Sequence, residues 1–276
     1  MPKPLVSIIT PTYGRAGFHE AIAACVKSQT YDNIEWLVLD DSEQPSPALS
    51  GLPADAVHYV HVGERLSIGE KRNRLVDMAR GELIAHFDDD DYYGPDYLTS
   101  MVAGLSAAKV DFVRLTGFFA AHLNQGQIGY YRTLVKHGHG FEFSARGVKP
   151  IVLDAANIPH IHLAFGWAYV YKKSVWRANP FKAINTFEDR EFVHAAAAQF
   201  KLKALEDQGA NCMHSVHRKS SSRCFPQFRV PAFMIKSLAP GAIRHFKWLC
   251  QIAKEQGQSP VQKRQATQTS HLALPN

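Results

Sequence analysis

The chain has 276 residues, of which 46% are apolar and 20% charged, and its formal net charge is +6. This balance is typical of a globular protein with one large α/β domain and a modest extension. No apolar run approaches the roughly 18–20 residues that cross a bilayer, and the start does not resemble a signal peptide, so we expect a cytoplasmic protein. Four scattered cysteines without a C-x-x-C pair indicate reduced thiols rather than a disulfide framework.

Strand and helix patterns alternate along the first 115 residues. Segments 5–10, 34–40, 57–62, 82–87 and 110–115 are predicted strands, and segments 19–29, 67–80 and 95–108 are predicted helices. Ser67 and Glu70 match a capping box at the start of the second helix, Gly81 fits its C-cap, and Pro95 fits the first turn of the third. Repeated strand–helix units predict a mainly parallel sheet with helices on both faces, which binds ligands at the carboxyl ends of its strands.

The pattern loosens after Thr116. Segments 118–122 and 128–134 flank Asn124, Gln125 and Gly126 and predict a hairpin. Residues 136–150 are rich in His and Gly and are expected to form a loop, residues 167–171 a strand, and residues 188–200 and 241–256 helices. We predict a domain over residues 1–215 with halves 1–115 and 116–215, a basic C-terminal helical extension over 216–258, and a disordered tail over 259–276.

Basic residues are concentrated near the C-terminus. Residues 214–264 hold ten Lys and Arg and one acid, so the rest of the chain carries 21 basic and 24 acidic residues, a net of −3. This asymmetry predicts an anionic partner for the tail. No nucleic-acid-binding module accompanies it, so we expect no nucleic acid. The amphipathic helix over 241–256 either packs on the core with its basic side in water or makes peripheral contact with an anionic membrane.

Four consecutive aspartates, residues 88–91, follow the strand at 82–87. If the strand alternation continued, Asp88 and Asp90 would share one side of the chain, about 6–7 Å apart. Two such carboxylates repel by roughly 2–3 kcal/mol at an effective dielectric near 20, so a cation or basic neighbours should offset them. Oxygen ligands suit Mg²⁺ or Mn²⁺, especially when substrate phosphates complete the shell. The plain alternative is a solvated acidic turn before a helix.

Polar side chains also follow the first two strands. Pro11-Thr12-Tyr13-Gly14-Arg15 ends the first, where small residues, a ring and a cation could hold a base and a phosphate. Asp40-Asp41-Ser42 ends the second, whose carboxylates could accept hydrogen bonds from a base or a ribose. On the helix at 67–80, Lys71 and Arg74 could form one basic face for a diphosphate. Each feature alone is also explained as a turn, a cap or surface charge.

Taken together, these motifs resemble those of glycosyltransferase family 2. The resemblance covers about residues 4–200 and is carried, in order, by Pro11-Thr12-Tyr13-Gly14-Arg15, Asp40-Asp41-Ser42-Glu43, Lys71-Arg72-Asn73, Asp88-Asp89-Asp90-Asp91 with Pro95, and Glu188-Asp189. It implies the Rossmann-like GT-A fold and transfer of a sugar from a nucleotide-sugar donor with inversion. The Ser and Glu at positions 42 and 43 depart from the family pattern, which usually has Gly after the double Asp.

The resemblance also implies roles for individual residues. Tyr13 would lie against the base, Asp88 and Asp90 would reach a Mn²⁺ or Mg²⁺ ion on the donor diphosphate, and Asp189 would be the general base for the acceptor hydroxyl. Thr186 to Asp189 also fits a capping pattern at a helix start, which would make Asp189 a cap instead. The complete nucleotide-binding set is Pro11, Thr12, Tyr13, Arg15, Asp40, Lys71, Arg72, Asn73, Asp88 and Asp89.

Histidines and cysteines cluster in the C-terminal third. Cys212, His214, His217 and Cys224 lack the usual zinc spacings, so a zinc site is not expected. His214 and His217 would either close the donor site near the diphosphate or lie in a surface loop. The histidines at positions 137, 139, 160 and 162 would line the acceptor side or be solvated.

The leading prediction is an inverting glycosyltransferase of polysaccharide biosynthesis, of class EC 2.4. It would move a sugar from a nucleotide-diphosphate donor, UDP-linked by resemblance, to a hydroxyl of a glycan or lipid-linked glycan. Residues 116–186 and the C-terminal region are expected to select that acceptor. The alternative is a nucleotide-sugar-binding module that has lost transfer, and donor hydrolysis or transfer would distinguish the two.

Overall fold

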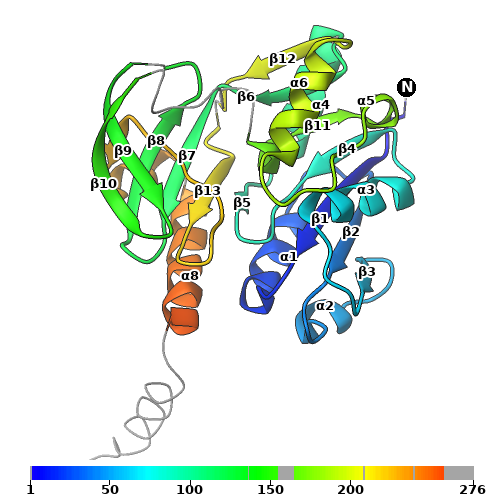
Figure 1. The fold of residues 1–276 in the computed structure, drawn as a ribbon, viewed down its shortest axis with the longest axis horizontal. Helices are drawn as coiled ribbons and strands as arrows, with labels where there is room; N and C mark the ends of the chain where they lie inside the picture. Colours follow the sequence, from blue (N-terminus) through cyan, green and yellow to red (C-terminus); the bar gives the residue numbers. More distant parts are fainter. Residues whose placement is uncertain (1, 136, 155–164, 208, 239, 258–276) are drawn as a thin grey trace, which may run out of the picture.

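A seven-stranded sheet forms the centre of the computed structural model, which describes residues 2–135, 137–154, 165–207, 209–238 and 240–257 (Figure 1). Its strand order is β12-β6-β11-β4-β1-β2-β3. β11 runs antiparallel to β4 and β6, and the other neighbours are parallel, so the predicted mainly parallel sheet is confirmed. The strands are β1 (Val6–Thr12), β2 (Ile34–Asp40), β3 (His58–His61), β4 (Leu83–His86), β6 (Phe112–Leu115), β11 (Val170–Lys172) and β12 (Leu202–Leu205).

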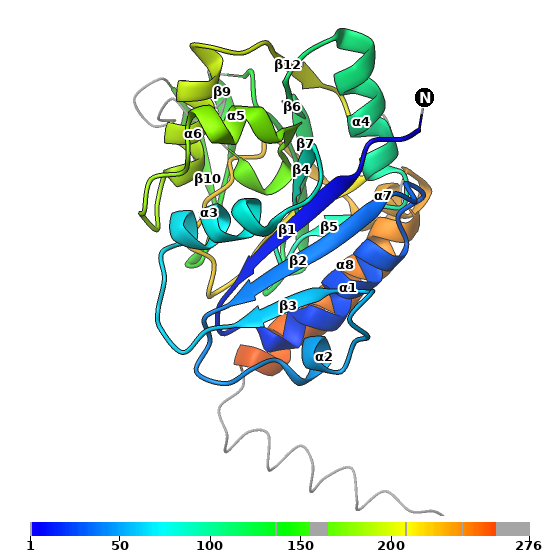
Figure 2. The same cartoon turned by 90° about the vertical axis from the view of Figure 1, so that its right-hand side faces the viewer.

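Side-chain alternation along the strands explains why helices cover both faces of this sheet. On β2, Trp36 and Val38 enter one apolar cluster, whereas Leu37 and Leu39 enter the other. The first cluster contains α1 (His19–Lys27), α4 (Tyr97–Ala108) and α8 (Pro240–Gly257), and the second contains α3 (Ile68–Met78), α5 (Lys173–Ala178) and α6 (Glu188–Ala197). Figure 2 shows α1 and α8 running alongside β1, β2 and β3. Short helices η1 (Ala16–Phe18), α2 (Pro47–Ser50) and η2 (Gly166–Ala168) join the larger elements.

A second, five-stranded sheet in the order β14-β8-β7-β13-β5 adjoins the first. Its antiparallel pair β7–β8 is the hairpin predicted around Asn124, Gln125 and Gly126. β13 pairs with both β7 and β5, and β5 lies directly after the four aspartates. This pairing brings the segment after residue 211 to the aspartates. The strands are β5 (Tyr92–Tyr93), β7 (Gly117–His122), β8 (Gln127–Arg132), β13 (Cys212–Val216) and β14 (Phe228–Val230), and α7 (Ala232–Leu238) follows.

The prediction of a loop over residues 136–150 is wrong. The structure has an antiparallel hairpin there, made of β9 (Gly138–Ser144) and β10 (Gly147–Leu153), which stands out in green in Figure 1. Glycines and histidines hide the strand pattern, because only Phe141 and Phe143 alternate inward. Gly140 has a packing reason, since a Cβ there would lie 2.9 Å from the Pro226 carbonyl oxygen.

Three element boundaries also differ from the sequence predictions. The capping box of Ser67 and Glu70 is confirmed, but Ala79 is the C-cap of α3, and Gly81 instead packs on β1, where a Cβ would lie 2.6 Å from the Leu5 carbonyl oxygen. α4 begins at Tyr97, so Pro95 lies before the helix rather than in its first turn. The strand predicted over 167–171 is divided, because Gly166–Ala168 form a 3₁₀ turn before β11.

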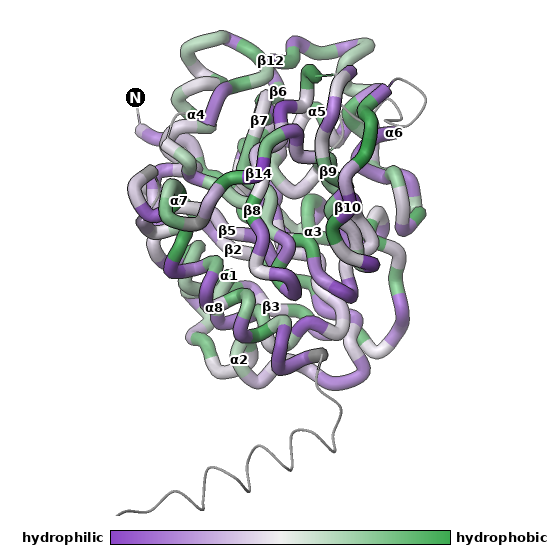
Figure 3. Tube along the Cα trace, turned by 90° about the vertical axis from the view of Figure 1, so that its left-hand side faces the viewer, coloured by the Kyte–Doolittle hydropathy of each residue, from purple (hydrophilic) through white to green (hydrophobic). Residues whose placement is uncertain are grey.

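α8 packs on the core, and its apolar stripe is covered. Leu249 is fully buried, Phe246 is 5% exposed and Ile252 7%, all within the cluster that also holds α1. Figure 3 shows polar and apolar segments alternating along this helix. The stripe is therefore not free to enter a lipid surface. Among the described helices, none combines the length and the apolar character needed to traverse a membrane.

Candidate active site

The carboxyl ends of β1, β2 and β4 meet at one edge of the sheet. Lys71, which is buried on α3, joins the first two ends: its Nζ donates to the Thr12 carbonyl oxygen at 2.9 Å and to Asp41 Oδ1 at 2.6 Å. Asp41 also accepts from the Arg65 guanidinium and from the Leu66 N–H. Three strand ends that are distant in sequence are thereby fixed beside α3, as the doubly wound arrangement predicts.

The four aspartates lie in a turn after β4 rather than in the strand, so strand alternation does not place them. Each one has at least one basic or hydrogen-bonding partner, and Asp89 and Asp90 share Arg15. Basic neighbours thus offset the mutual repulsion of the carboxylates, one of the two outcomes expected from the sequence. The contacts are Asp88 with Arg72 (3.5 Å), Asp89 with Thr12 Oγ1 (2.5 Å) and Arg15 (2.8 Å), Asp90 with Arg15 (2.8 Å) and His217 Nε2 (2.8 Å), and Asp91 with Ser215 N (2.6 Å) and His214 Nδ1 (3.1 Å).

Asp88 differs from its neighbours in exposure and in charge compensation. Its side chain is 29% exposed, whereas that of Asp90 is 6% exposed and that of Asp89 is 1%. Burial raises the pKa of Asp88, and the distant Arg72 only partly opposes this. Burial also disfavours the charge of Asp90, but Arg15 and His217 outweigh it and hold the pKa of that carboxyl well below its usual range. Asp88 is therefore the most accessible of the four carboxylates, and its cationic partner Arg72 lies 3.5 Å away.

Arg72 connects the aspartate turn to α6. Its side chain is 4% exposed, and its NH1 donates to Glu188 Oε1 at 2.8 Å while NH2 reaches Asp88 Oδ1 at 3.5 Å. Burial raises the pKa of Glu188, and Arg72 opposes that shift. The Nε of Arg72 is buried and has no hydrogen-bond partner among the residues that the structure describes. One guanidinium thus holds the Glu-Asp pair at the start of α6 next to Asp88.

Asp189 does not cap its own helix, so the capping alternative is wrong. The N-cap of α6 is Phe187, which has a positive φ of 65° and makes no side-chain cap bond. Asp189 Oδ2 instead accepts from the Gly166 N–H at 2.8 Å and the Phe165 N–H at 3.2 Å. A Cβ at Gly166 would lie 2.6 Å from Asp189 Cβ and 2.9 Å from Arg72 NH1. Gly166 therefore lies against both Asp189 and Arg72, and only glycine fits at this position.

Tyr13 and Asp40 lie at neighbouring strand ends but differ in accessibility. Tyr13 is 41% exposed, and the Arg65 guanidinium carbon lies 3.4 Å from its ring centroid. Asp40 is 1% exposed and accepts from Tyr59 OH at 2.7 Å and from the Ser42 N–H at 2.9 Å. Tyr13, at the end of β1 near Pro11, therefore offers an accessible aromatic surface on which a flat ring could stack, whereas Asp40 is not accessible.

The basic face predicted from Lys71 and Arg74 is wrong. Lys71 is buried against Asp41, and Arg74 pairs at the surface with Glu64 at 2.8 Å. Asn73 has a structural role: its Oδ1 accepts from the Trp176 Nε1–H and from the Phe181 N–H, and its amide donates to the Phe181 carbonyl oxygen. Neither Lys71 nor Asn73 has a free polar group directed at the aspartate turn.

His214 and His217 are buried against the aspartates rather than in a surface loop. His214 stacks on Trp167 with centroids 5.2 Å apart, and His217 stacks on Phe18 at 5.0 Å. The Lys219 N–H donates to His217 Nδ1 at 3.2 Å, so the ring proton is on Nε2 and is donated to Asp90.

The cysteines near these histidines have other neighbours. Cys212 Sγ contacts Asp207 at 3.4 Å, and Cys224 is a free, buried thiol. Within the described ranges, no group of three or more His, Cys, Asp and Glu residues is arranged to hold a metal ion. His137 precedes β9 and His139 lies in it, while residues 160 and 162 fall outside the described residues.

Several residues of the site carry no sequence signal of their own. Arg65 and Glu188 are found only through their contacts with Tyr13 and Arg72. Phe165 has a positive φ of 103°, a strained conformation that Asp189 helps to hold through its backbone N–H. An isolated arginine or phenylalanine in a loop has no periodic pattern, so only tertiary structure reveals these partners.

Replacing Arg72 with methionine should strongly destabilise the protein. The side chain of Glu188 is 7% exposed, and it would remain buried after losing Arg72, its one cationic partner among the residues that the structure describes. Removing one partner of a buried ion pair typically lowers the free energy of unfolding by about 3–5 kcal/mol. Urea unfolding of the variant and the native protein would measure this loss. Arg74→Met is the control, two residues further along the same helix. It should lower the free energy of unfolding by about 0–1 kcal/mol, because the ion pair of Arg74 is exposed. Equal losses in the two variants would contradict the linking role of Arg72.

Comparison with known families identifies these features. The model of Glycosyl transferase family 2 matches residues 7–131, which include β1, β2, α3 and the aspartate turn. Residues 7–131 belong to glycosyltransferase family 2. Among curated relatives, the Bacillus subtilis glycosyltransferase named EpsH is 32% identical to this chain over 105 residues, which are 37% of the chain and 30% of EpsH. The chain thus spans less than a third of that relative.

Solved structures confirm the GT-A fold of this chain. S. aureus TarS, solved with UDP-GlcNAc, matches with a TM-score of 0.57 and 18% identity over 79% of this chain and 61% of TarS. The mannosyltransferase PcManGT of Pyrobaculum calidifontis, solved with GDP-Man and Mn²⁺, matches with a TM-score of 0.56 and 17% identity over 100% of this chain and 82% of PcManGT. At these identities the likeness concerns the fold.

Proposed function

We propose that the chain transfers a sugar from a nucleotide-diphosphate donor to a hydroxyl of a glycan or lipid-linked glycan. The observation that supports this proposal is the double contact of Arg72, which pairs with Asp88 at 3.5 Å and with Glu188, the residue before Asp189, at 2.8 Å. A metal-binding carboxylate and a general base must flank the anomeric carbon from two sides, and this arrangement supplies both.

The nucleotide would lie over the ends of β1 and β2. Tyr13 offers an exposed ring already paired with Arg65, a surface on which a base can stack. Arg15, 22% exposed, lies beside Asp89 and Asp90 and can face a phosphate. Lys71 and Asn73 support the site from behind and are left out of the donor contacts. UDP is the nucleotide we propose, and the neighbours solved with UDP-GlcNAc and with GDP-Man make both bases reasonable probes.

The residues present fit a Mg²⁺ or Mn²⁺ ion of the kind that uses one or two protein carboxylates and completes its shell with phosphates and water. Asp88 would hold it, because its carboxylate is accessible and poorly compensated. Asp90 would be the second ligand if Arg15 or His217 releases it. When bound, the ion would neutralise charge on the leaving nucleoside diphosphate. Mn²⁺ in the related PcManGT structure supports this choice.

Asp189 would act on the acceptor. Two backbone N–H groups bind its Oδ2, and Oδ1 accepts from the Arg190 N–H at 2.7 Å, so the carboxylate is fixed in orientation. It would remove the proton of the attacking hydroxyl as the bond to the anomeric carbon forms. A single displacement of this type inverts the anomeric configuration. Arg72, by holding Glu188, keeps Asp189 at the edge of the donor site.

Polysaccharide biosynthesis is the setting we propose. The Escherichia coli protein named for colanic acid biosynthesis, WcaA, is 31% identical over 105 residues, and the Bacillus subtilis protein named for teichuronic acid biosynthesis, TuaG, is 29% identical over 100. These similarities lie in about a third of the chain.

Thermal unfolding with a panel of nucleoside diphosphates and nucleotide sugars, with and without Mn²⁺, tests the donor site. A ligand at about 100 times its dissociation constant stabilises the folded state by roughly 2.7 kcal/mol. We expect a Mn²⁺-dependent shift with one nucleotide class. No shift with any nucleotide, in a protein shown to be folded, would contradict the proposal. A shift without any transfer or donor hydrolysis would favour the alternative, a binding module that has lost activity.

A further inference from the structure

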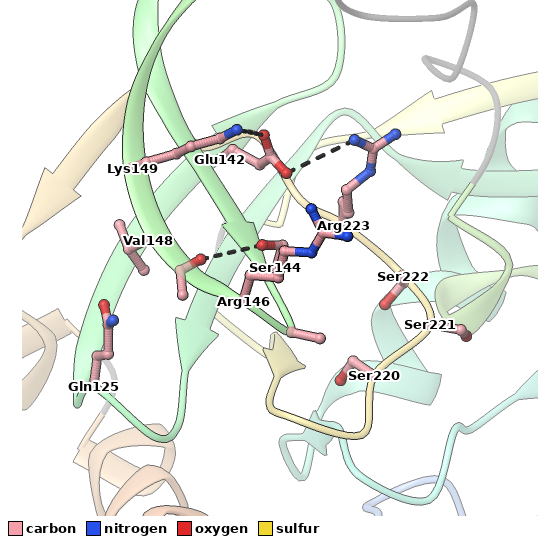
Figure 4. Close-up of a pocket in the computed structure, with 12 residues that line it drawn as sticks. Gln125, Glu142, Ser144, Arg146, Val148, Lys149, Ser220, Ser221, Ser222 and Arg223 are labelled. Carbon is pink, nitrogen blue, oxygen red and sulfur yellow. Dashed lines mark hydrogen bonds and ion pairs between the residues drawn. The ribbon is translucent and has the colours of Figure 1, made fainter.

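A pocket of about 530 Å³ lies beside the β9–β10 hairpin, in a region to which the proposed donor site assigns no role. One wall is the turn that closes the hairpin, and the other is the loop of residues 220–223 (Figure 4). Gln125, from the turn between β7 and β8, completes the lining. The volume falls within the roughly 300–1,000 Å³ that small-molecule sites occupy.

The lining of this pocket is cationic. Arg146, Lys149 and Arg223 face one carboxylate, Glu142, which gives a net charge of +2 (three cations minus one acid). Figure 4 shows Lys149 and Arg223 reaching Glu142 from opposite sides, at 3.1 Å and 3.7 Å. Arg146 is exposed and, within the described part of the chain, pairs with no carboxylate. Because Lys149 and Arg223 share a single carboxylate and Arg146 has none, the pocket keeps an excess of two positive charges.

Hydroxyl groups supply neutral hydrogen-bond donors in the same pocket. Ser144 on β9 donates to the Gly147 carbonyl oxygen at 3.3 Å, and three consecutive serines, 220–222, lie on the opposite loop (Figure 4). The loop continues the basic stretch of Arg218 and Lys219, which line a neighbouring cavity of about 260 Å³. Several cations and hydroxyls around one volume favour an anion with many acceptor oxygens.

The serine loop is bound to the same histidines that hold the aspartates. Ser220 Oγ accepts from the His217 N–H at 3.0 Å, and Ser222 Oγ lies 3.3 Å from His214 Nε2. His214 stacks on Trp167, the residue next to Gly166, whose N–H binds Asp189. A chain of contacts through His214 and Trp167 therefore connects the serine loop to Gly166, which binds Asp189.

We propose that this pocket binds a phosphate group carried by the acceptor, which makes the acceptor a phosphorylated glycan or lipid. The identification of the phosphate-bearing molecule as the acceptor rests on the proposed function. The binding of phosphate in this pocket can be tested without it. A neutral sugar would leave the excess of two positive charges unused. A carboxylate offers only two oxygens to three cationic side chains and several hydroxyls, whereas a phosphate offers three or four.

Calorimetric titration in EDTA, without nucleotide, tests the site directly. The probes are glycerol 3-phosphate, uncharged glycerol, glucuronate and dihexanoylphosphatidylglycerol below its micelle concentration. We expect saturable binding of glycerol 3-phosphate that weakens with salt, and no binding of glycerol. Binding of the lipid as well would assign the phosphate to a lipid-linked acceptor, and binding of the soluble phosphate alone would assign it to a glycan.

Matched charge variants locate the binding. Arg146→Gln, Lys149→Gln and Arg223→Gln together should raise the dissociation constant of glycerol 3-phosphate by about tenfold or more. The control triple Lys27→Gln, Arg177→Gln and Lys203→Gln removes the same charge from exposed positions elsewhere and should leave it unchanged. Both triples should keep the Mn²⁺-dependent thermal shift with nucleotide, which shows that they fold.

Three results would overturn the inference: no saturable binding of either phosphate probe, glucuronate binding as tightly as glycerol 3-phosphate, or equal weakening in both triple variants. These results leave the donor site untouched, because it is read out by nucleotide and Mn²⁺. Conversely, the native protein could bind the phosphate probe and show no thermal shift with any nucleotide. That result would contradict the proposed function and support the phosphate site.

Discussion

Asp189→Asn should reduce transfer by about 10²- to 10⁴-fold, the usual contribution of a general base. The substitution removes the basic carboxylate but leaves an amide oxygen that can still accept the Gly166 N–H now bound by Oδ2, whereas the amide NH2 cannot accept the Arg190 N–H now bound by Oδ1. Donor affinity should therefore change little, and the free energy of unfolding should fall by about 1–3 kcal/mol, the cost of one lost hydrogen bond. The measurement is the initial rate of nucleoside diphosphate release with a panel of glycan acceptors, together with the nucleotide dissociation constant.

Glu191→Gln is the matched control for Asp189→Asn. Glu191 is an acid on the same helix, but it is 34% exposed and pairs with Lys182 and Arg190 at the surface. Its amide variant should transfer at the native rate. A native rate in Asp189→Asn, or an equal loss in both variants, would remove Asp189 from the role of base.

Asp88→Asn should abolish the metal-dependent part of donor binding. In the native protein a saturating nucleotide with Mn²⁺ should add roughly 2.7 kcal/mol of stability at 100 times the dissociation constant, and in the variant that increment should fall close to zero. The unliganded variant should be as stable as the native protein or more so, because burial raises the pKa of Asp88 and its charge is only weakly compensated.

Asp96→Asn provides the comparison for Asp88→Asn. Asp96 is an exposed aspartate just after the same turn, where it accepts a hydrogen bond from Thr30 Oγ1 at 2.8 Å. This variant should keep the full Mn²⁺-dependent shift. If Asp88→Asn kept it too, the ion would be held elsewhere or not needed, and the assignment of Asp88 would be wrong.

The sheet could be predicted from the sequence because its strands are buried on both faces. Segments such as Ile34–Asp40 are nearly continuous apolar runs, and the structure confirms that strand with the same bounds. The β9–β10 hairpin could not be predicted in this way, because it presents polar side chains and glycines to solvent. Its structure depends on pairing with its own partner strand and on contact with Pro226, which no local pattern encodes.

The site shows the same division between local and tertiary information. The order of the motifs at residues 11–15, 40–43, 71–73, 88–91 and 188–189 sufficed to predict which strand ends meet. The sequence could not show that Lys71 and Asn73 are occupied by other protein groups. Nor could it show that Asp189 binds the Gly166 backbone in addition to the Arg190 N–H of its own helix, because the contact with Gly166 needs the positive φ of Phe165.

Release of nucleoside diphosphate from the donor chosen by thermal unfolding is the most direct test of the central claim. The rate should be measured with Mn²⁺ and with EDTA, in the native protein and in the Asp88 and Asp189 variants. We expect release that requires the metal, is lost in Asp88→Asn and falls by about two to four powers of ten in Asp189→Asn. Nucleotide binding without release, under every metal and acceptor condition, would contradict the claim that this chain is a working transferase.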